Sequence, residues 1–197
     1  MTAERVTVIT LTYRRPDDLR EAIPLLLDAI SDHPSAELLV IDNDETPSAA
    51  ETVGRLADPR VRYMHEPRPG IAAARNRGLD ETRDSDVIVF IDDDERPQPG
   101  WLNALLELRR ASGAEAVAGP VVSQFADELD PWIVAGGYFD RLRHPTGTSI
   151  PVAATNNLLL DRAFVDRTGL RFDEAFGLSG GSDSVFTREL VKAGGRI

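Results

Sequence analysis

Short apolar runs alternate along this chain with segments of helical character. The first run, VTVITL at residues 6–11, is rich in β-branched residues and is typical of a strand buried on both faces. Similar runs follow at residues 38–41, 61–64, 87–91 and 116–122, and a further strand-like pattern lies at 157–160. Strands that alternate with helices predict a mostly parallel sheet covered on both faces, which is an α/β fold.

The helical segments begin at recognisable signals. Pro16 and Asp17 open the first, in which apolar residues are spaced for one helical face. We expect Pro24, inside that pattern, to kink or split the helix. The Ala-rich stretch IAAARNRGLDET begins a second helix at residue 71, after Pro69-Gly70, and two more helices are predicted at residues 101–110 and 183–193.

Residues 123–150 have weaker periodicity and contain several Gly, Pro and aromatic residues. Two interpretations stay open: a lid or acceptor loop that leaves the sheet, or an irregular surface insertion. The aromatic side chains of Trp132, Tyr138 and Phe139 would stack on a sugar in the first case. Alternatively, they fill the core beneath the insertion.

The bulk composition excludes several classes of function. A chain of 197 residues predicts one domain, and its last residues, KAGGRI, read as a helix end followed by the start of a strand, so we expect the domain to continue beyond residue 197. The net charge of −11 argues against nucleic-acid binding. The absence of cysteine excludes disulfides, thiolate zinc sites and cysteine nucleophiles. No membrane span or signal peptide is predicted, so we expect a cytoplasmic protein.

Polar clusters follow three of the predicted strands. They are Thr10-Thr12-Tyr13, the residues 42–44 (Asp-Asn-Asp) and the residues 92–94 (Asp-Asp-Asp). Two carboxylates about 4 Å apart repel by roughly 4 kcal/mol at an effective dielectric of 20, so three consecutive aspartates require water or a cation. Ligands of parallel sheets gather at the carboxyl ends of the strands, and carboxylate oxygens suit Mg²⁺ or Mn²⁺ bridging to phosphates. The pattern therefore favours a nucleotide diphosphate held through a divalent ion.

Each of these residues also has a simpler structural interpretation. The three aspartates could form a solvated turn after a strand, and Asp42 could cap the following helix. Arg75 could be an ordinary surface arginine, and Asp183 could be only a helix N-cap.

Five motifs occur here in the order found in family 2 glycosyltransferases of the GT-A fold, which the chain resembles over nearly its whole length. They are TYRRPDDL, VIDND, RPGIAAARNRG, FIDDDERPQPGWL and GGSDSVFTRELVKAGGRI. The ARNRG and IDDDE-x-P-x-PGWL motifs are most similar to bacterial exopolysaccharide glucosyltransferases of the succinoglycan type. The resemblance implies a Rossmann-like three-layer sandwich with a mostly parallel central sheet, as a single GT-A domain over residues 1–197.

The resemblance also implies roles for the matching positions. Asp94 corresponds to the metal ligand of the family's DxD motif, and Asp183 to the catalytic base. The positions implied to contact the nucleotide-sugar are Thr10, Asp42, Arg75, Asp92 and Asp93. The implied activity is an inverting, metal-dependent hexosyl transfer from a UDP-sugar, with Mn²⁺ or Mg²⁺ on the diphosphate. The implied acceptor is a polysaccharide or a lipid-linked oligosaccharide, with any membrane contact peripheral, at the inner face.

One motif departs from the family pattern. Relatives commonly show Glu-Asp-x-Asp where this chain reads Ser182-Asp183-Ser184-Val185, so the base position is kept and two neighbouring acids are absent. This departure leaves open a non-catalytic module that binds nucleotide-sugars or divalent cations. A sugar-phosphate nucleotidyltransferase is a further alternative, disfavoured because no glycine-rich loop follows the first strand.

Overall fold

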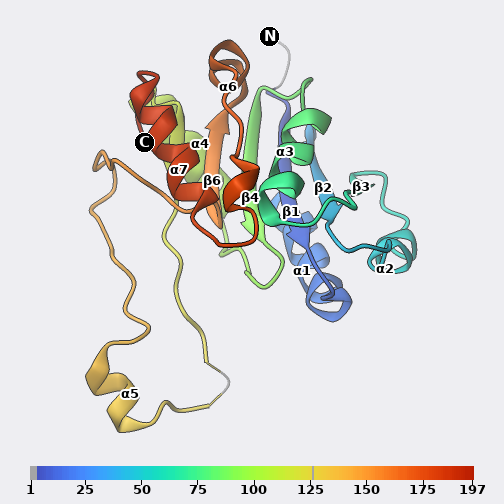
Figure 1. Ribbon diagram of the computed structural model, residues 1–197, viewed down its shortest axis with the longest axis horizontal. Helices are drawn as coiled ribbons and strands as arrows, with labels where there is room; N and C mark the ends of the chain where they lie inside the picture. The colour runs from blue at the N-terminus through green and yellow to red at the C-terminus, as the bar shows by residue number, and fades with distance from the viewer. Residues whose placement is uncertain (1–3, 126) are drawn as a thin grey trace.

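A six-stranded sheet forms the centre of the fold in the computed structural model, which describes residues 4–125 and 127–197 (Figure 1). The strands are β1 (Val6–Thr12), β2 (Ala36–Asp42), β3 (Val61–His65), β4 (Val87–Asp92), β5 (Ala116–Ala118) and β6 (Asn157–Asp161). Their order across the sheet is β3-β2-β1-β4-β6-β5. β1 to β4 are parallel, as the sequence predicts, whereas β6 runs antiparallel to both of its neighbours.

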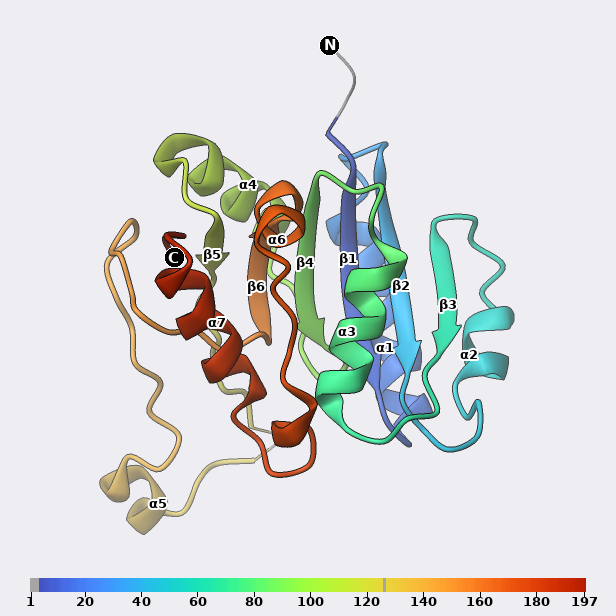
Figure 2. The same cartoon turned by 45° about the horizontal axis from the view of Figure 1, so that its top comes forward.

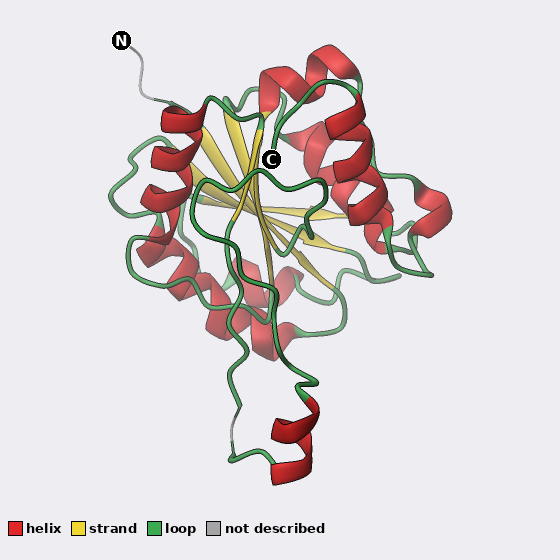
Figure 3. Cartoon of the chain, turned by 90° about the vertical axis from the view of Figure 1, so that its left-hand side faces the viewer, coloured by secondary structure: helices red, strands yellow, loops and turns green. Residues whose placement is uncertain are grey.

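Helices cover both faces of this sheet and give the three layers that were expected (Figures 2 and 3). Successive strand residues point to opposite faces, so Val8 packs on one side and Ile9 on the other. The first face is covered by α1 (Pro16–Ala29), α2 (Ala50–Gly54) and α4 (Trp101–Ser112). The second is covered by α3 (Ile71–Glu81), α6 (Arg162–Thr168) and α7 (Ser182–Lys192).

Two local predictions are corrected by the structure. The expected split at Pro24 does not occur, because α1 runs without a break from Pro16 to Ala29. Pro24 faces solvent while the buried Ile23 and Leu26 hold both halves of the helix on the sheet, and this packing outweighs the single lost hydrogen bond. The strand expected over 116–122 ends at Ala118 because Pro120 cannot donate to a ladder.

Residues 121–150, called the arm below, leave the sheet after β5 and carry the short helix α5 (Pro131–Gly136) away from the layers (Figures 1 and 3). The aromatic side chains of its described part do not fill the core. Trp132 and Tyr138 are 64% and 68% exposed and contact each other edge-to-face with ring centroids 5.9 Å apart. The alternative in which they pack beneath an insertion is therefore wrong.

No helix within the described ranges has both the length and the apolar character needed to cross a lipid bilayer.

Candidate functional site

The three polar clusters meet at one edge of the sheet. Thr12 pairs in register with Asp42 of β2, and Leu11 pairs with Asp92 of β4. Because β1, β2 and β4 are parallel, their carboxyl ends open on the same side. β1 lies between β2 and β4, so this edge is the switch point at which α/β sheets bind ligands.

A cavity of about 520 Å³ opens at that edge. This volume lies within the roughly 300–1,000 Å³ of small-molecule sites. Its polar wall includes Thr12, Arg15, Asn43 and the three consecutive aspartates, and its opposite wall is made by residues 69–71, Ala74 and residues 177–178. The backbone closes that wall tightly, since the amide of Ile71 donates to the carbonyl of Gly177 at 3.2 Å.

The three aspartates of this cavity have different surroundings. Asp93 is only 5% exposed, and its Oδ2 has no hydrogen-bond partner among the described atoms. Burial raises the pKa of Asp93, while the charge of Arg15 opposes the rise. Burial also raises the pKa of Asp92, which Arg75 lowers in part and the neighbouring carboxylates raise further. Asp94 is exposed and accepts a 2.9 Å hydrogen bond from Nη1 of Arg15.

The aspartates fit a divalent cation only as part of a shared site. Within residues 4–125 and 127–197, no group of three or more His, Asp or Glu side chains converges as a complete set of ligands. Mg²⁺ is commonly held by one or two carboxylates with phosphate and water completing its octahedron. The unpartnered Oδ2 of Asp93 and the exposed Asp94 carboxylate match that partial donor set.

Arg75 lies on α3 behind this wall and is buried without an ion pair among the described residues. Its side chain is 6% exposed, its Nη1 donates to Oγ of Ser182 at 2.8 Å, and its Nε has no partner. Burial lowers the pKa of Arg75, and the charges of Asp183 and Asp92 act against that shift. The guanidinium also lies 5.4 Å from the ring centroid of Phe172. A buried cation between two carboxylates, with spare donors, is suited to an anionic ligand.

Asp42 is occupied by the chain's own donors. It is fully buried, and its Oδ2 accepts from the amide of Ala49 at 2.8 Å and from the hydroxyl of Tyr63 at 2.9 Å. Its Oδ1 accepts from the amide of Asp44 at 3.2 Å and from Ser48 at 3.4 Å. The N-cap residue of α2 is Ala49 and not Asp42, so these bonds fix the loop between β2 and α2 instead of capping the helix. Thr10 is likewise fully buried and does not line the cavity, although its hydroxyl has no partner among the described residues.

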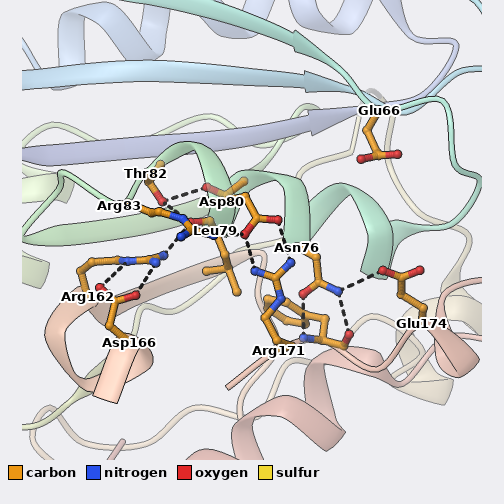
Figure 4. Close-up of polar contacts among 12 residues, drawn as sticks. Glu66, Asn76, Leu79, Asp80, Thr82, Arg83, Arg162, Asp166, Arg171 and Glu174 are labelled. Carbon is orange, nitrogen blue, oxygen red and sulfur yellow. Dashed lines mark hydrogen bonds and ion pairs between the residues drawn. The ribbon is translucent and has the colours of Figure 1, made fainter. Parts of the chain in front are cut away.

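The segment after α6 is fastened to α3 (Figure 4). Arg75 lies on this helix. The side chain of Asn76 pairs with the backbone of Phe172 in both directions, donating to its carbonyl and accepting from its amide at 2.9 Å each. Arg171 contacts both carboxylate oxygens of Asp80 at 2.7 and 2.8 Å. Phe172 in turn stacks on Phe186 of α7 with centroids 4.0 Å apart. These contacts hold α3 and α7 at a fixed separation beside the cavity.

A fourth acid follows the aspartates. Glu95 is half-buried, and burial together with the charge of Asp92 raises its pKa from 4.5 to about 7. Its Oε1 accepts a 2.9 Å hydrogen bond from Nδ2 of Asn156. Asn157 pairs with Ile91 at the carboxyl end of β4, because β6 is antiparallel. The start of β6 therefore belongs to the same edge as the aspartates.

The match to known families decides the class of this site. Residues 7–169 match the family model described as Glycosyl transferase family 2. The chain belongs to this family. A curated relative of this family 2 glycosyltransferase, the succinoglycan biosynthesis protein ExoM of Rhizobium meliloti (strain 1021), is 34% identical over 189 residues. Those residues are 94% of this chain and 61% of ExoM, so the chain spans about three fifths of that relative.

Solved structures agree on the fold of this family 2 glycosyltransferase, which is the GT-A fold that the motifs implied. The mannosyltransferase PcManGT from Pyrobaculum calidifontis, in complex with GDP-Man and Mn²⁺, superposes with a TM-score of 0.68 at 23% identity, over 95% of this chain and 51% of its own. S. aureus TarS 1–349 in complex with UDP-GlcNAc superposes with a TM-score of 0.67 at 15% identity, over 93% of this chain and 52% of its own.

Among the residues named from sequence, the structure places Asp92, Asp93 and Asp94 in the cavity, and the charges of Arg75 and Asp183 act on Asp92. Sequence reasoning missed Arg15 and Ser182. Ser182 had a signal, since it stands where relatives carry an acid. Arg15 had none, because its partners lie 78 and 79 residues away along the chain.

Proposed function

We propose that this glycosyltransferase moves a hexosyl group from a UDP-sugar to a saccharide or lipid-linked oligosaccharide, with inversion at the anomeric carbon and Mn²⁺ or Mg²⁺ on the diphosphate. The observation that carries the proposal is the buried Arg75, which has no ion pair within the described chain and lies beside Asp92 and Asp183. A buried arginine without an ion pair is typical of a site that binds an anion. The complexes of TarS with UDP-GlcNAc and of PcManGT with GDP-Man support a nucleotide-sugar donor.

The cavity residues would divide the work of binding the donor. Asp94, with Asp93 beside it, would hold a divalent cation, which neutralises charge on the departing diphosphate. Arg75 would donate to the diphosphate oxygens, and Asp92 would contact the ribose or diphosphate. Thr10 and Asp42 are fully buried and would support the nucleotide from beneath, and Asp42 would act mainly by fixing the loop after β2.

Asp183 would act on the acceptor. Its carboxylate takes the proton from the attacking hydroxyl as that oxygen bonds to the anomeric carbon. The bond from the anomeric carbon to the diphosphate oxygen breaks at the same time, and UDP leaves with the electron pair. One step with attack opposite the leaving group inverts the configuration. Asp183 lies in the first turn of α7, which places it next to Arg75 without a direct ion pair.

The acceptor would approach from the side of the arm. The exposed Trp132, Tyr138 and Phe139 offer faces on which sugar rings stack. The resemblance to ExoM supports an acceptor in exopolysaccharide synthesis. Such acceptors are often carried on lipid, so we infer a cytoplasmic protein whose membrane contact is peripheral.

The proposal is tested with a panel of UDP- and GDP-sugars in the presence of Mn²⁺, Mg²⁺ or EDTA. We expect UDP with Mn²⁺ to raise the melting temperature, and one UDP-sugar to release UDP when the acceptor is supplied. Protection without release from any donor would indicate the non-catalytic binding module, which the missing acids around Asp183 favour. If GDP raised the melting temperature and UDP did not, the assignment of uracil as the nucleobase of the donor would be contradicted.

A further inference from the structure

Arg15 occupies the cation position of the aspartate cluster. Its Nη1 lies 3.4 Å from Oδ1 of Asp93 and 2.9 Å from Oδ2 of Asp94. These are the two carboxylates that the proposed function gives to a divalent ion. The same guanidinium lines the cavity in which the donor would lie.

Other arginines near the cluster are directed elsewhere. Arg96 donates to the backbone carbonyls of Asp93 and Glu95 and pairs with Glu21 of α1. Arg75 approaches from behind the wall and contacts Ser182. Within the described residues, Arg15 is thus the side-chain cation that lies within ion-pair distance of both Asp93 and Asp94.

A guanidinium and a divalent cation compete for these oxygens, because two cations a few ångströms apart repel each other. We propose, on the basis of the function proposed above, that Arg15 is a counter-ion that changes partner when the site fills. It pairs with Asp93 and Asp94 in the empty site, gives up these carboxylates to the divalent ion, and then pairs with the diphosphate of the donor.

The geometry permits this exchange without unfolding the loop. The side chain of Arg15 is 51% exposed, so it can rotate away from the aspartates. The preceding residue, Arg14, has a left-handed backbone with φ of 57° and is held by a 3.1 Å bond from its Nε to Asp44. The side chain of Arg14 therefore ties this turn to the loop after β2, while the half-exposed side chain of Arg15 has solvent into which it can move.

The first test measures binding of Mn²⁺ alone by electron paramagnetic resonance, with no nucleotide present. We expect Arg15→Gln to bind Mn²⁺ about three- to tenfold more tightly than the wild type, because the ion no longer displaces a cation. Arg20→Gln is the matched control, since it removes the same charge from an exposed pair with Asp17. Its affinity should equal that of the wild type.

The second test measures UDP binding by calorimetry at saturating Mn²⁺. The expected effect of the substitution on affinity is now a loss. Arg15→Gln should bind UDP about tenfold more weakly than the wild type, because a partner of the diphosphate is lost. Arg15→Lys keeps the charge but not the planar fork, so its affinities should lie between those of the wild type and Arg15→Gln. Circular dichroism of each variant reports whether the start of α1 remains folded.

The outcomes separate this proposal from the function on which it rests. Wild-type protein that binds neither Mn²⁺ nor UDP overturns both. Wild-type protein that binds both, with Arg15→Gln no tighter for Mn²⁺ than Arg20→Gln, overturns the exchange and leaves the transferase proposal standing. If Arg15→Gln binds Mn²⁺ more tightly than the wild type but binds UDP equally well, Arg15 does not pair with the diphosphate.

Discussion

Nη1 of Arg75 donates a 2.8 Å hydrogen bond to Oγ of Ser182, and both side chains are buried. The bond joins α3 to the first turn of α7, one residue before Asp183. A glutamate at this position, which the motif of the resembled family would place there, would form an ion pair with Arg75, whereas Ser182 makes a neutral contact. The charge of Arg75 is therefore left available for a ligand.

Removing the Ser182 hydroxyl should release Arg75 from its position. We expect Ser182→Ala to weaken UDP binding about three- to tenfold and to lower the free energy of unfolding by about 1 to 2 kcal/mol, because a buried charged donor loses its partner. Ser182→Thr keeps the hydroxyl and should restore much of the affinity. Ser184→Ala is the control, since that hydroxyl makes no hydrogen bond among the described residues. Equal affinity in Ser182→Ala and Ser184→Ala would show that the contact does not position Arg75.

Substitutions of Asp94 and Asp183 should impair different steps, metal-assisted binding and sugar transfer respectively. Asp94→Asn removes the charge of the proposed metal ligand, so we expect UDP no longer to gain affinity from Mn²⁺. Asp183→Asn should keep donor affinity within about twofold and lower kcat by about 10²- to 10⁴-fold, the usual contribution of a general base. Calorimetry and UDP release distinguish the two losses. Normal transfer by Asp183→Asn would remove Asp183 from the mechanism.

The buried carboxylate of Asp42 should contribute more to stability than to binding. In Asp42→Asn, one oxygen becomes an amide that faces donors such as the hydroxyl of Tyr63. We expect a loss of about 2 to 3 kcal/mol in urea denaturation, because hydrogen bonds to a charged acceptor are lost. Asp17→Asn, at a carboxylate that is 86% exposed, should change stability by less than about 0.5 kcal/mol. An Asp42→Asn protein of normal stability that binds no UDP would instead favour a direct nucleotide contact.

Gly70 should not tolerate a side chain. Its φ is 109°, and an added Cβ would lie 3.2 Å from the backbone carbon of Gly177 in the opposite segment of the cavity wall. Gly70→Ala should therefore destabilise the protein by about 1 to 3 kcal/mol in thermal unfolding. Gly54→Ala in α2 is the matched change, because a Cβ there meets nothing within 4 Å. That variant should gain up to about 1 kcal/mol, and an equal loss at both positions would contradict the close approach.

Glu95 should make stability depend on pH. Its pKa of about 7 lies above its ordinary value of 4.5, because burial and the charge of Asp92 disfavour the carboxylate. Between these values the folded protein keeps a proton that the unfolded chain has released, so the free energy of unfolding falls as pH rises from 4.5 through 7. Glu95→Gln removes this contribution and still offers Asn156 an acceptor.

The measurement is urea denaturation in EDTA at pH 4.5 and pH 8. We expect Glu95→Gln to match the wild type at the lower pH and to exceed it at the higher pH by on the order of 1 to 2 kcal/mol, a value reduced for the partial exposure of the side chain. A difference that does not grow with pH would show that folding does not raise the pKa of Glu95.

The sequence was sufficient to predict the parallel core and the meeting of Asp42 with Asp92 across β1. Both follow from alternation of strand and helix, because parallel strands bring their carboxyl ends together. The direction of β6 could not be predicted, since an apolar run such as Leu158–Leu160 is compatible with either direction of pairing with β4. A carboxylate such as Asp42 serves equally as cap or ligand until its neighbours are known.

The other contacts that could not be predicted join residues that are distant along the chain. The contact of Arg15 with Asp94 depends on how the loop after β1 turns, and the left-handed backbone of Arg14 shows no signal in its residue type. The pairing of Asn76 with Phe172 spans 96 residues, so Asn76 reads from sequence as an ordinary polar position on a helix.

The reversed β6 makes the arm leave and re-enter the sheet at the same place. The amide of Gly119 donates to the carbonyl of Asn157, and Nδ2 of Asn157 donates to the carbonyl of Pro120, so both roots of the arm are tied together. Asn156 then links this junction to Glu95, one residue from Asp94. The junction of β5 and β6, from which the arm departs, is thus joined to the acidic loop through a side-chain hydrogen bond.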